Sequence, residues 1–190
     1  MYSRFDILKN PFVDFSARVL LSVSLVCTLL ISWYASRQGI AFQGAIGARS
    51  GQEVSFFQNL ITNLSAISTM ALFYYVYALF RKLPIRLIDA FVVCATARII
   101  IYLITLSTGL EFIKDLSLMI ERSLAMGDLT LASMPKTAVF FLSVYGLLLV
   151  AMLIYYLVFL VTGLRYVSNS KHKLDAIAIV CLLIIAQLIL

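Results

Sequence analysis

Residues 87–107 read LIDAFVVCATARIIIYLITLS, an apolar stretch that holds two charged side chains, Asp89 near its start and Arg98 near its middle. A helix needs about 20 apolar residues to cross the hydrocarbon core of a bilayer, and this stretch has that length. An arginine at the bilayer centre costs about 2.5 to 3.5 kcal/mol on insertion scales, so Arg98 is expected to face protein or trapped water. The stretch therefore predicts a membrane-spanning helix whose arginine is held by other parts of the chain.

The composition of the whole chain indicates that lipid is its solvent. Of 190 residues, 63% are hydrophobic and only 13% are charged, too few charges for a water-soluble surface. Apolar runs of spanning length occur at about 17–36, 57–80, 86–107, 138–163 and 174–190. They lack the alternation of a barrel strand, so helices are the expected spans. The sequence predicts an all-α fold, a five-helix membrane bundle that forms one domain over residues 1–190.

The long connection between the third and fourth spans has a helical pattern of its own. Its sequence over residues 110–128 is LEFIKDLSLMIERSLAMGD. The apolar side chains at helical spacing are Phe112, Ile113, Leu116, Met119, Ile120 and Leu124. This pattern predicts an amphipathic helix that lies on the outer membrane interface, or one that folds back on the bundle as a cap.

The lysines and arginines that flank the spans predict the orientation. One side holds nine of them: Arg4, Lys9, Arg18, Arg81, Lys82, Arg86, Arg165, Lys171 and Lys173. The other side holds five: Arg37, Arg49, Lys114, Arg122 and Lys136. The positive-inside rule then puts the N-terminus in the cytoplasm and, after five crossings, the C-terminus outside.

Arg98 lies about 20 Å along the third span, slightly past the middle of the core. A guanidinium has five hydrogen-bond donors and therefore needs several acceptors at that depth. Tyr102 shares the face of Arg98, and polar residues of other spans reach a similar level, namely Thr28, Ser32, Asn63, Ser68 and Gln187. We predict a buried polar cluster of Arg98, Asn63, Gln187 and Tyr102. Three roles for this cluster remain open. It could hold the helices together, form a pocket for a ligand or anionic lipid, or line a conduction path.

Asp89 is separated from Arg98 by nine residues, which amount to about 13.5 Å of helical rise, so the two side chains cannot pair. Asp89 is expected at the cytoplasmic edge of the membrane, as a helix-start acid or in an ion pair with Arg86 and Arg18.

Short basic connections are expected to contact anionic lipid at the cytoplasmic surface. The residues concerned are Arg81, Lys82, Lys171 and Lys173. Each of these side chains contributes about 1 kcal/mol to the free energy of attraction to an anionic membrane surface. The same charges could bind an acidic protein partner or a second copy of the chain. Ordinary topology signals explain these residues equally well.

The residues that catalysis usually needs are missing from the sequence. There is one histidine, and no H-E-x-x-H, G-x-S-x-G or P-loop motif occurs. Cys27, Cys94 and Cys181 fall inside the predicted spans and have the spacing of neither a metal site nor a disulfide framework. We therefore expect no enzymatic activity, no cofactor, no metal and no nucleic-acid partner.

Several short motifs follow one another in an informative order. NPF at residues 10–12 is followed by FQGAIGARSG at 42–51 and by RKLPIRLIDAFVVCATARIIIYLI at 81–104. This order resembles the Yip family, five-span membrane proteins named for their interaction with Ypt/Rab GTPases, and most closely its bacterial branch. The most specific part is the basic turn followed by Ile88, Asp89 and Ala90 and then by Ala97 and Arg98. The resemblance implies a helical bundle in the bacterial inner membrane with a cytoplasmic N-terminus.

Two departures from that family restrict what the resemblance implies. Bacterial relatives often have a proline near the position of Ile99 or Ile100, and a kink is not carried over. Many relatives carry Asp and His in the first loop, where this chain has Gln43, Gly47 and Arg49, so no metal or proton role is assigned to that loop.

The resemblance implies a non-enzymatic membrane protein that organises membrane or binds protein and lipid partners through its short basic loops. Two other functions remain open on the residues alone. One is a small transporter or channel subunit with a polar site around Arg98, and the other is a lipid-binding protein. A water-filled path to Arg98 would favour transport, whereas a closed cluster would favour a scaffold.

Overall fold

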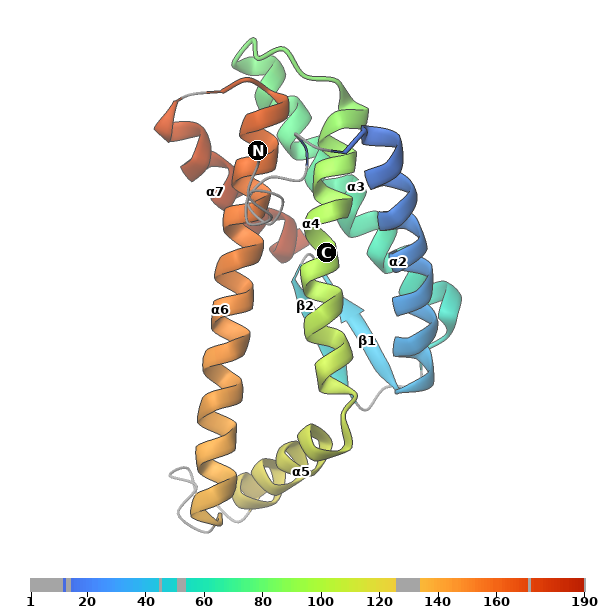
Figure 1. Cartoon of the computed structure of the whole chain (residues 1–190), viewed down its shortest axis with the longest axis vertical. Coiled ribbons are helices and arrows are strands. Elements are labelled where there is room, and N and C mark those ends of the chain that lie inside the picture. Colours follow the sequence, from blue (N-terminus) through green and yellow to red (C-terminus); the bar gives the residue numbers. More distant parts are fainter. Residues whose placement is uncertain are drawn as a thin grey trace, which may run out of the picture.

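The computed structural model describes residues 12, 15–44, 46–50, 54–125, 134–170 and 172–189. Its helices are α2 (Ala17–Arg37), α3 (Phe56–Phe80), α4 (Leu87–Thr108), α5 (Glu111–Ala125), α6 (Lys136–Val167) and α7 (Lys173–Ile189), and its strands are β1 (Ile40–Gln43) and β2 (Gly47–Ser50). Each of the five predicted apolar runs forms a helix, so the predicted helical class is confirmed (Figure 1).

Helix α4 occupies the middle of the molecule and packs against α2, α3 and α6 (Figure 1). Its buried positions include Ala90, Val93, Ala95 and Ala97, all of which are fully enclosed. Small side chains let neighbouring helices approach closely, which is the main source of helix association where lipid removes the hydrophobic driving force. The stretch with the intramembrane arginine is therefore the one that the protein surrounds most completely.

Local sequence signals set several helix ends. Ser16 and Ser55 precede α2 and α3, and their hydroxyl groups accept hydrogen bonds from the backbone N–H groups of Val19 and Gln58. Such caps satisfy N–H groups that have no partner within the helix. Pro135 stands immediately before α6 and needs no such partner, because it has no N–H.

In the described part of the chain, four helices are long and apolar enough to cross a membrane, namely α2, α3, α4 and α6. This confirms the prediction of a membrane protein with transmembrane helices. Helix α7 has 17 residues, about 25 Å of rise, which is less than the hydrocarbon core of about 30 Å. Figure 1 shows α7 ending near the mid-height of the molecule, whereas α6 runs almost its full length. A fifth full crossing stays a prediction.

The connection between α2 and α3 is an antiparallel hairpin, which the all-α prediction did not include. Gln43 pairs with Gly47 and Ile40 pairs with Ser50. Strand β1 contacts both α2 and α3, and its residues Ile40 to Phe42 are buried. In Figure 1 the hairpin lies beside the long helices rather than beyond their ends. Non-helical backbone is tolerated at membrane depth only where protein encloses it or where it lines a watery cavity.

The predicted helix of the long connection is present as α5, which crosses the lower end of α4 and α6 at an angle (Figure 1). Leu116 is buried against Ala138 at the start of α6, with Ile113 and Ile120 beside it. Other apolar residues of the helix, such as Phe112, are exposed. The predicted apolar face is thus divided between contact with α6 and an uncovered surface, while the side chain of Leu124 lies outside the described residues.

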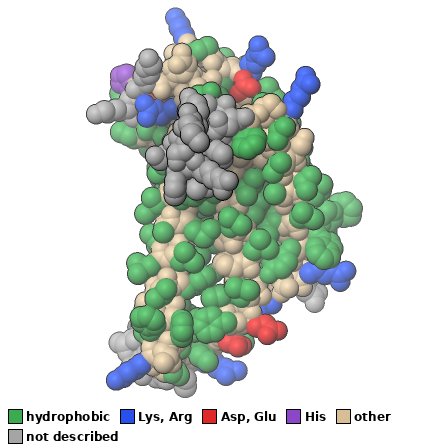
Figure 2. All heavy atoms as spheres, in the orientation of Figure 1, with side chains coloured by type: hydrophobic (Ala, Val, Ile, Leu, Met, Phe, Trp, Pro, Cys, Tyr) green, Lys and Arg blue, Asp and Glu red, His purple; other side chains and the backbone are tan. Residues whose placement is uncertain are grey.

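The surface has the distribution that lipid requires. Figure 2 shows hydrophobic side chains over the middle of the molecule, whereas lysines and arginines gather toward its two ends. The most exposed apolar side chains of α6 include Leu147 at 72% and Phe140 at 65%. Apolar exposure on this scale destabilises a protein in water, but acyl chains cover it in a bilayer.

Candidate functional site

Arg98 lies inside the protein and donates hydrogen bonds to two separate segments. Its side chain is only 3% exposed. Nε donates to Oδ1 of Asn63 on α3 at 3.0 Å, and Nη2 donates to the backbone carbonyl of Gly44 in the hairpin turn at 3.1 Å. Charge-assisted hydrogen bonds of this kind are roughly twice as strong as neutral ones. The buried charge therefore ties α4 to both α3 and the hairpin.

Asn63 extends this network to a third helix. It is fully buried, and its Nδ2 donates to the hydroxyl oxygen of Ser32 on α2 at 3.2 Å. We call Arg98, Asn63, Ser32 and Gly44 the Arg98 cluster. The cluster combines two of the residues expected at this depth, Asn63 and Ser32, with a backbone carbonyl.

Tyr102 lies one turn beyond Arg98 on α4 and is 3% exposed. Its hydroxyl group lies 2.9 Å from the hydroxyl oxygen of Thr28 on α2, and its ring packs edge-on against Phe42 at 6.2 Å between centroids. Tyr102 thus joins α4 to α2 and to β1 and borders the Arg98 cluster.

Gln187, on α7, contacts the hairpin turn. Its Oε1 accepts a hydrogen bond from the backbone N–H of Ile46 at 2.8 Å. Arg98 binds the carbonyl of Gly44, so the two side chains hold neighbouring backbone groups of the same turn. The structure therefore brings the four predicted residues to one place, with Arg98 bound to Gly44 and Gln187 bound to Ile46 of the same hairpin.

Asn59 was missed at the sequence level, although it anchors the same hairpin. It lies one turn before Asn63 and is 1% exposed. Its Nδ2 donates to the carbonyl of Ile40 at 2.9 Å, and its Oδ1 accepts from the N–H of Phe42 at 3.2 Å. This side chain satisfies a donor and an acceptor on the edge of β1, which lipid could not do. The sequence did contain a signal for this role, since two asparagines four residues apart in an apolar run lie on the same face of a helix.

The predicted ion pair of Asp89 with Arg86 and Arg18 is wrong. Among the described residues, neither arginine lies within ion-pair distance of Asp89, and the ion pair at this end joins Arg81 to Asp175 at 3.4 Å. Asp89 is half-buried in the first turn of α4, where the partial positive charge of the helix N-terminus stabilises a carboxylate without a cation. Both arginines project from exposed positions.

Asp175 takes the role that sequence reasoning gave to Asp89. It is 1% exposed at the start of α7. Besides its ion pair it accepts hydrogen bonds from the hydroxyl groups of Tyr77, at 2.5 Å, and Ser170. A buried carboxylate needs several such partners, and these fix the start of α7 against the end of α3.

Basic side chains gather at this end of the molecule. We call Arg81, Lys82, Arg86 and Arg165 the basic edge; the first three are exposed. Of the other predicted contacts, Lys171 lies outside the described residues, and Lys173 is the first residue of α7, where only its backbone is described.

Two further observations on the described residues concern metal ligands and a groove. Among them, no group of three His, Cys, Asp or Glu side chains is close enough to hold a metal ion. An apolar groove of about 360 Å³ lies between α2 and α4, with Trp33, Tyr34 and Tyr102 among its lining residues. In a membrane this groove faces acyl chains.

We expect Gly44→Ala to lower the free energy of unfolding by about 2 kcal/mol. Gly44 has a φ of +62°, which costs other residues about 1 kcal/mol, and an added Cβ would approach the amide atoms of Gln187 to 2.7 Å. Gln187 would have to move and lose its bond to Ile46, a further loss of about 1 kcal/mol. Unfolding by SDS in mixed micelles, followed through the fluorescence of Trp33, measures the change.

The control for this prediction is Gln187→Ala, alone and combined with Gly44→Ala. If the two residues collide, the double variant loses less stability than the sum of the single variants. Strict additivity would show that the added methyl group does not displace Gln187.

Comparison of the chain with protein-family models, with characterised proteins and with solved structures finds no match. The function is therefore inferred from the site alone.

Proposed function

We propose that the protein is a non-enzymatic integral membrane protein of the Yip type, a helical scaffold that presents its basic edge to lipid or protein partners. The observation that supports this most is the enclosure of Arg98. An intramembrane arginine is by default a candidate for a substrate or ion site. Here its hydrogen bonds go to Asn63 and to the carbonyl of Gly44, and only 3% of its surface is accessible.

A transport path would need the charge of Arg98 to face water or a bound solute during part of a cycle. The Arg98 cluster instead joins α2, α3, α4 and the hairpin, so exposing the guanidinium would break bonds to two of these segments. The intramembrane charge then serves the fold, and the surface left for recognition is the basic edge. This favours a scaffold over a transporter or channel subunit.

The orientation that we propose follows from charge. The basic edge and the N-terminus face the cytoplasm of a bacterium, across its inner membrane, and α5 lies at the outer interface with Phe112 toward lipid. Helix α7 enters from the cytoplasmic side, and its described residues extend to the hairpin, where Gln187 binds Ile46. The predicted exterior position of the C-terminus depends on a full fifth crossing.

Labelling of Cys94 tests the enclosure of Arg98. Cys94 lies one turn before Arg98 and is 4% exposed. In a protein with Cys27→Ala and Cys181→Ala, held in sealed vesicles, a membrane-impermeant maleimide should react with Cys94 at least about a hundredfold more slowly than with an exposed thiol, from either side. Denaturation in SDS should restore full labelling.

The matched control is Ser117→Cys on α5, an exposed position, in the same background with Cys94→Ala. Its rapid labelling from the outer face alone would agree with the proposed orientation. Labelling of Cys94 from one side at a rate near that of the Ser117→Cys protein would reveal a water path to Arg98. Transport would then replace the scaffold as the proposed function.

A further inference from the structure

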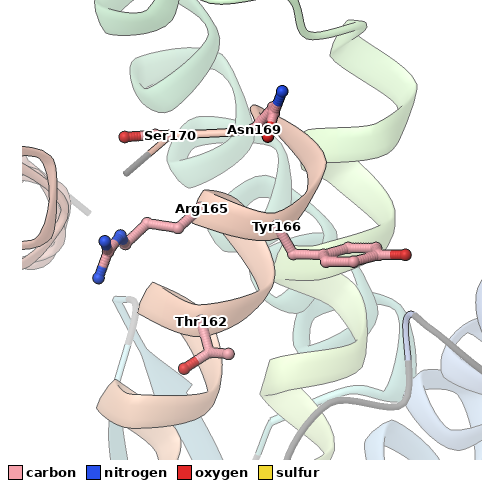
Figure 3. Close-up of a pocket in the computed structure, with 5 residues that line it drawn as sticks. All are labelled: Thr162, Arg165, Tyr166, Asn169 and Ser170. Atoms are coloured by element: carbon pink, nitrogen blue, oxygen red, sulfur yellow. The ribbon is translucent and has the colours of Figure 1, made fainter. Parts of the chain in front are cut away.

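An open polar pocket of about 560 Å³ lies at the end of α6, within the basic edge. It is lined by Thr162, Arg165, Tyr166, Asn169 and Ser170. Figure 3 shows the side chains of Thr162, Arg165 and Ser170 pointing to one side of α6, whereas Tyr166 points to the other. The last turn of a membrane-length helix therefore brings one positive charge and several small polar groups to a single hollow.

The guanidinium of Arg165 has unused hydrogen-bonding capacity. Its Nε is shielded from solvent and has no hydrogen-bond partner among the described residues. A buried donor left without an acceptor costs about 1 to 3 kcal/mol, and a ligand acceptor recovers that energy when the partly exposed Arg165 side chain turns to meet it. Native structures rarely leave such a donor unpaired without a functional reason.

Neighbouring donors in the pocket are also free to bind a ligand. Within the described part of the chain, neither the hydroxyl group of Thr162 nor the side-chain amide of Asn169 makes a hydrogen bond, while the backbone N–H of Asn169 donates to the carbonyl of Tyr166. Ser170 donates its hydroxyl hydrogen to Asp175, which lies outside the lining of the pocket and is paired with Arg81. Among the described residues that line the pocket there is no carboxylate, so none of them is a counterion for Arg165.

We infer that this pocket binds a phosphate group, and that the phosphate is the headgroup of an anionic phospholipid. The planar fork of an arginine matches phosphate oxygens with two parallel N–H donors. Position favours a lipid over a soluble anion, because Arg165 is two residues from the end of α6 and exposed apolar side chains such as Val158 precede it on the same helix. A headgroup could sit in the pocket while its acyl chains follow α6. The inference rests on the proposed function, since it identifies a lipid partner for the basic edge.

The test uses the full chain in nanodiscs that contain equal amounts of phosphatidylglycerol and phosphatidylcholine. Native mass spectrometry of the released protein counts the phospholipids that stay bound. We expect retention of phosphatidylglycerol over phosphatidylcholine, and a fall of about tenfold in that preference for Arg165→Gln, which removes the charge but keeps hydrogen-bonding capacity. Thr162→Val, which loses only a hydroxyl group, should lower the preference about threefold.

Arg86→Gln is the matched control, because Arg86 is an exposed arginine of the same edge that lies outside this pocket and makes no capping bond through its side chain. The preference of the Arg86→Gln protein for phosphatidylglycerol over phosphatidylcholine should stay within about twofold of that of the parent protein. Equal losses in Arg86→Gln and Arg165→Gln would overturn the inference, since they would show diffuse attraction to the basic edge. An unchanged preference in Arg165→Gln would overturn it as well. Circular dichroism and Trp33 fluorescence establish that each variant is folded.

A second arm separates the two sources of phosphate. Inorganic phosphate is titrated into nanodiscs of phosphatidylcholine alone, and binding is followed by protection of the protein against thermal unfolding. The pocket is assigned to a lipid headgroup if two results agree. Inorganic phosphate should protect the parent and Arg165→Gln proteins equally little, and the retention of phosphatidylglycerol should depend on Arg165. Protection that Arg165→Gln abolishes would assign it to a soluble phosphate compound and overturn the lipid.

Failure of this inference and failure of the proposed function give different results. Labelling of Cys94 reports on the scaffold and is independent of Arg165. If Cys94 is labelled slowly but the protein shows no preference among lipids, the proposed scaffold function stands and only the lipid site is rejected.

Discussion

Asn63→Leu is expected to lower the free energy of unfolding by about 3 kcal/mol, the cost of removing one acceptor from a buried charge together with one buried donor. The substitution removes the Oδ1 atom that accepts from Nε of Arg98 and the Nδ2 atom that donates to Ser32. Leucine keeps the branch point and the number of side-chain heavy atoms of asparagine, so the hydrogen bonds are the main thing that the substitution removes. SDS unfolding followed through Trp33 fluorescence measures it.

Ser68→Leu is the matched control, because it places the same apolar side chain on α3 at an exposed position. Lipid should cover the new leucine, and stability should change by less than about 0.5 kcal/mol. The double variant Asn63→Leu with Arg98→Met removes the charge together with its partner and should recover part of the loss. A stability for Asn63→Leu equal to that of Ser68→Leu would mean that Arg98 does not depend on Asn63.

Gly163→Leu should lower the free energy of unfolding by about 3 kcal/mol through overpacking. A Cβ at Gly163 would already approach Cγ1 of Val93 to 2.7 Å and Cε2 of Phe12 to 2.5 Å. Val93 lies on α4 and is fully buried. Because the interior is closely packed where α6 and α4 meet, the side chain of Val93 has no room to move away from a larger residue at position 163. Gly163→Ala should show a smaller loss of the same sign by the same SDS unfolding measurement.

Gly146→Leu on the same helix provides the comparison, since a Cβ there would meet nothing within 4 Å. Its effect should remain below about 1 kcal/mol and include a gain from helix propensity. Similar losses at the two glycines would show that α6 and α4 do not pack at Gly163 as the structure has them.

The helices were predictable because membrane insertion depends on properties that each segment carries by itself. A run of apolar residues about 20 long has few alternatives in lipid, and serines, prolines and glycines mark its ends. The proximity of Arg98 and Asn63 followed from the same reasoning, because a rise of 1.5 Å per residue converts chain position into depth. Depth restricts the possible partners of a charge to a few polar residues.

The hairpin was not predictable in the same way. Ile40 to Phe42 is a short apolar run between Gly39 and Gly44, a pattern that suits a strand and an ordinary surface loop equally well. Its position beside the long helices depends on Asn59, Arg98 and Gln187, which lie on three different helices. No single segment carries the information that a loop is enclosed.

The error at Asp89 has a related cause. Charge and chain position put both Asp89 and Asp175 near basic residues at one membrane edge. Which of them is paired depended on how α7 packs against α3, because that contact places Asp175 beside Arg81 and Tyr77. Hydropathy contains no information about which helices touch.

The sequence by itself determined the apolar character that suits the long helices to lipid, their approximate bounds and the position of Arg98 along α4. The tertiary structure alone decided that a loop carbonyl shares Arg98 with Asn63, that Gln187 of α7 binds the hairpin, and that Arg165 faces an open pocket. The physical reason is the range of the forces involved. Transfer into lipid acts on each segment separately, whereas a hydrogen bond or a close helix contact requires two segments to meet in one geometry.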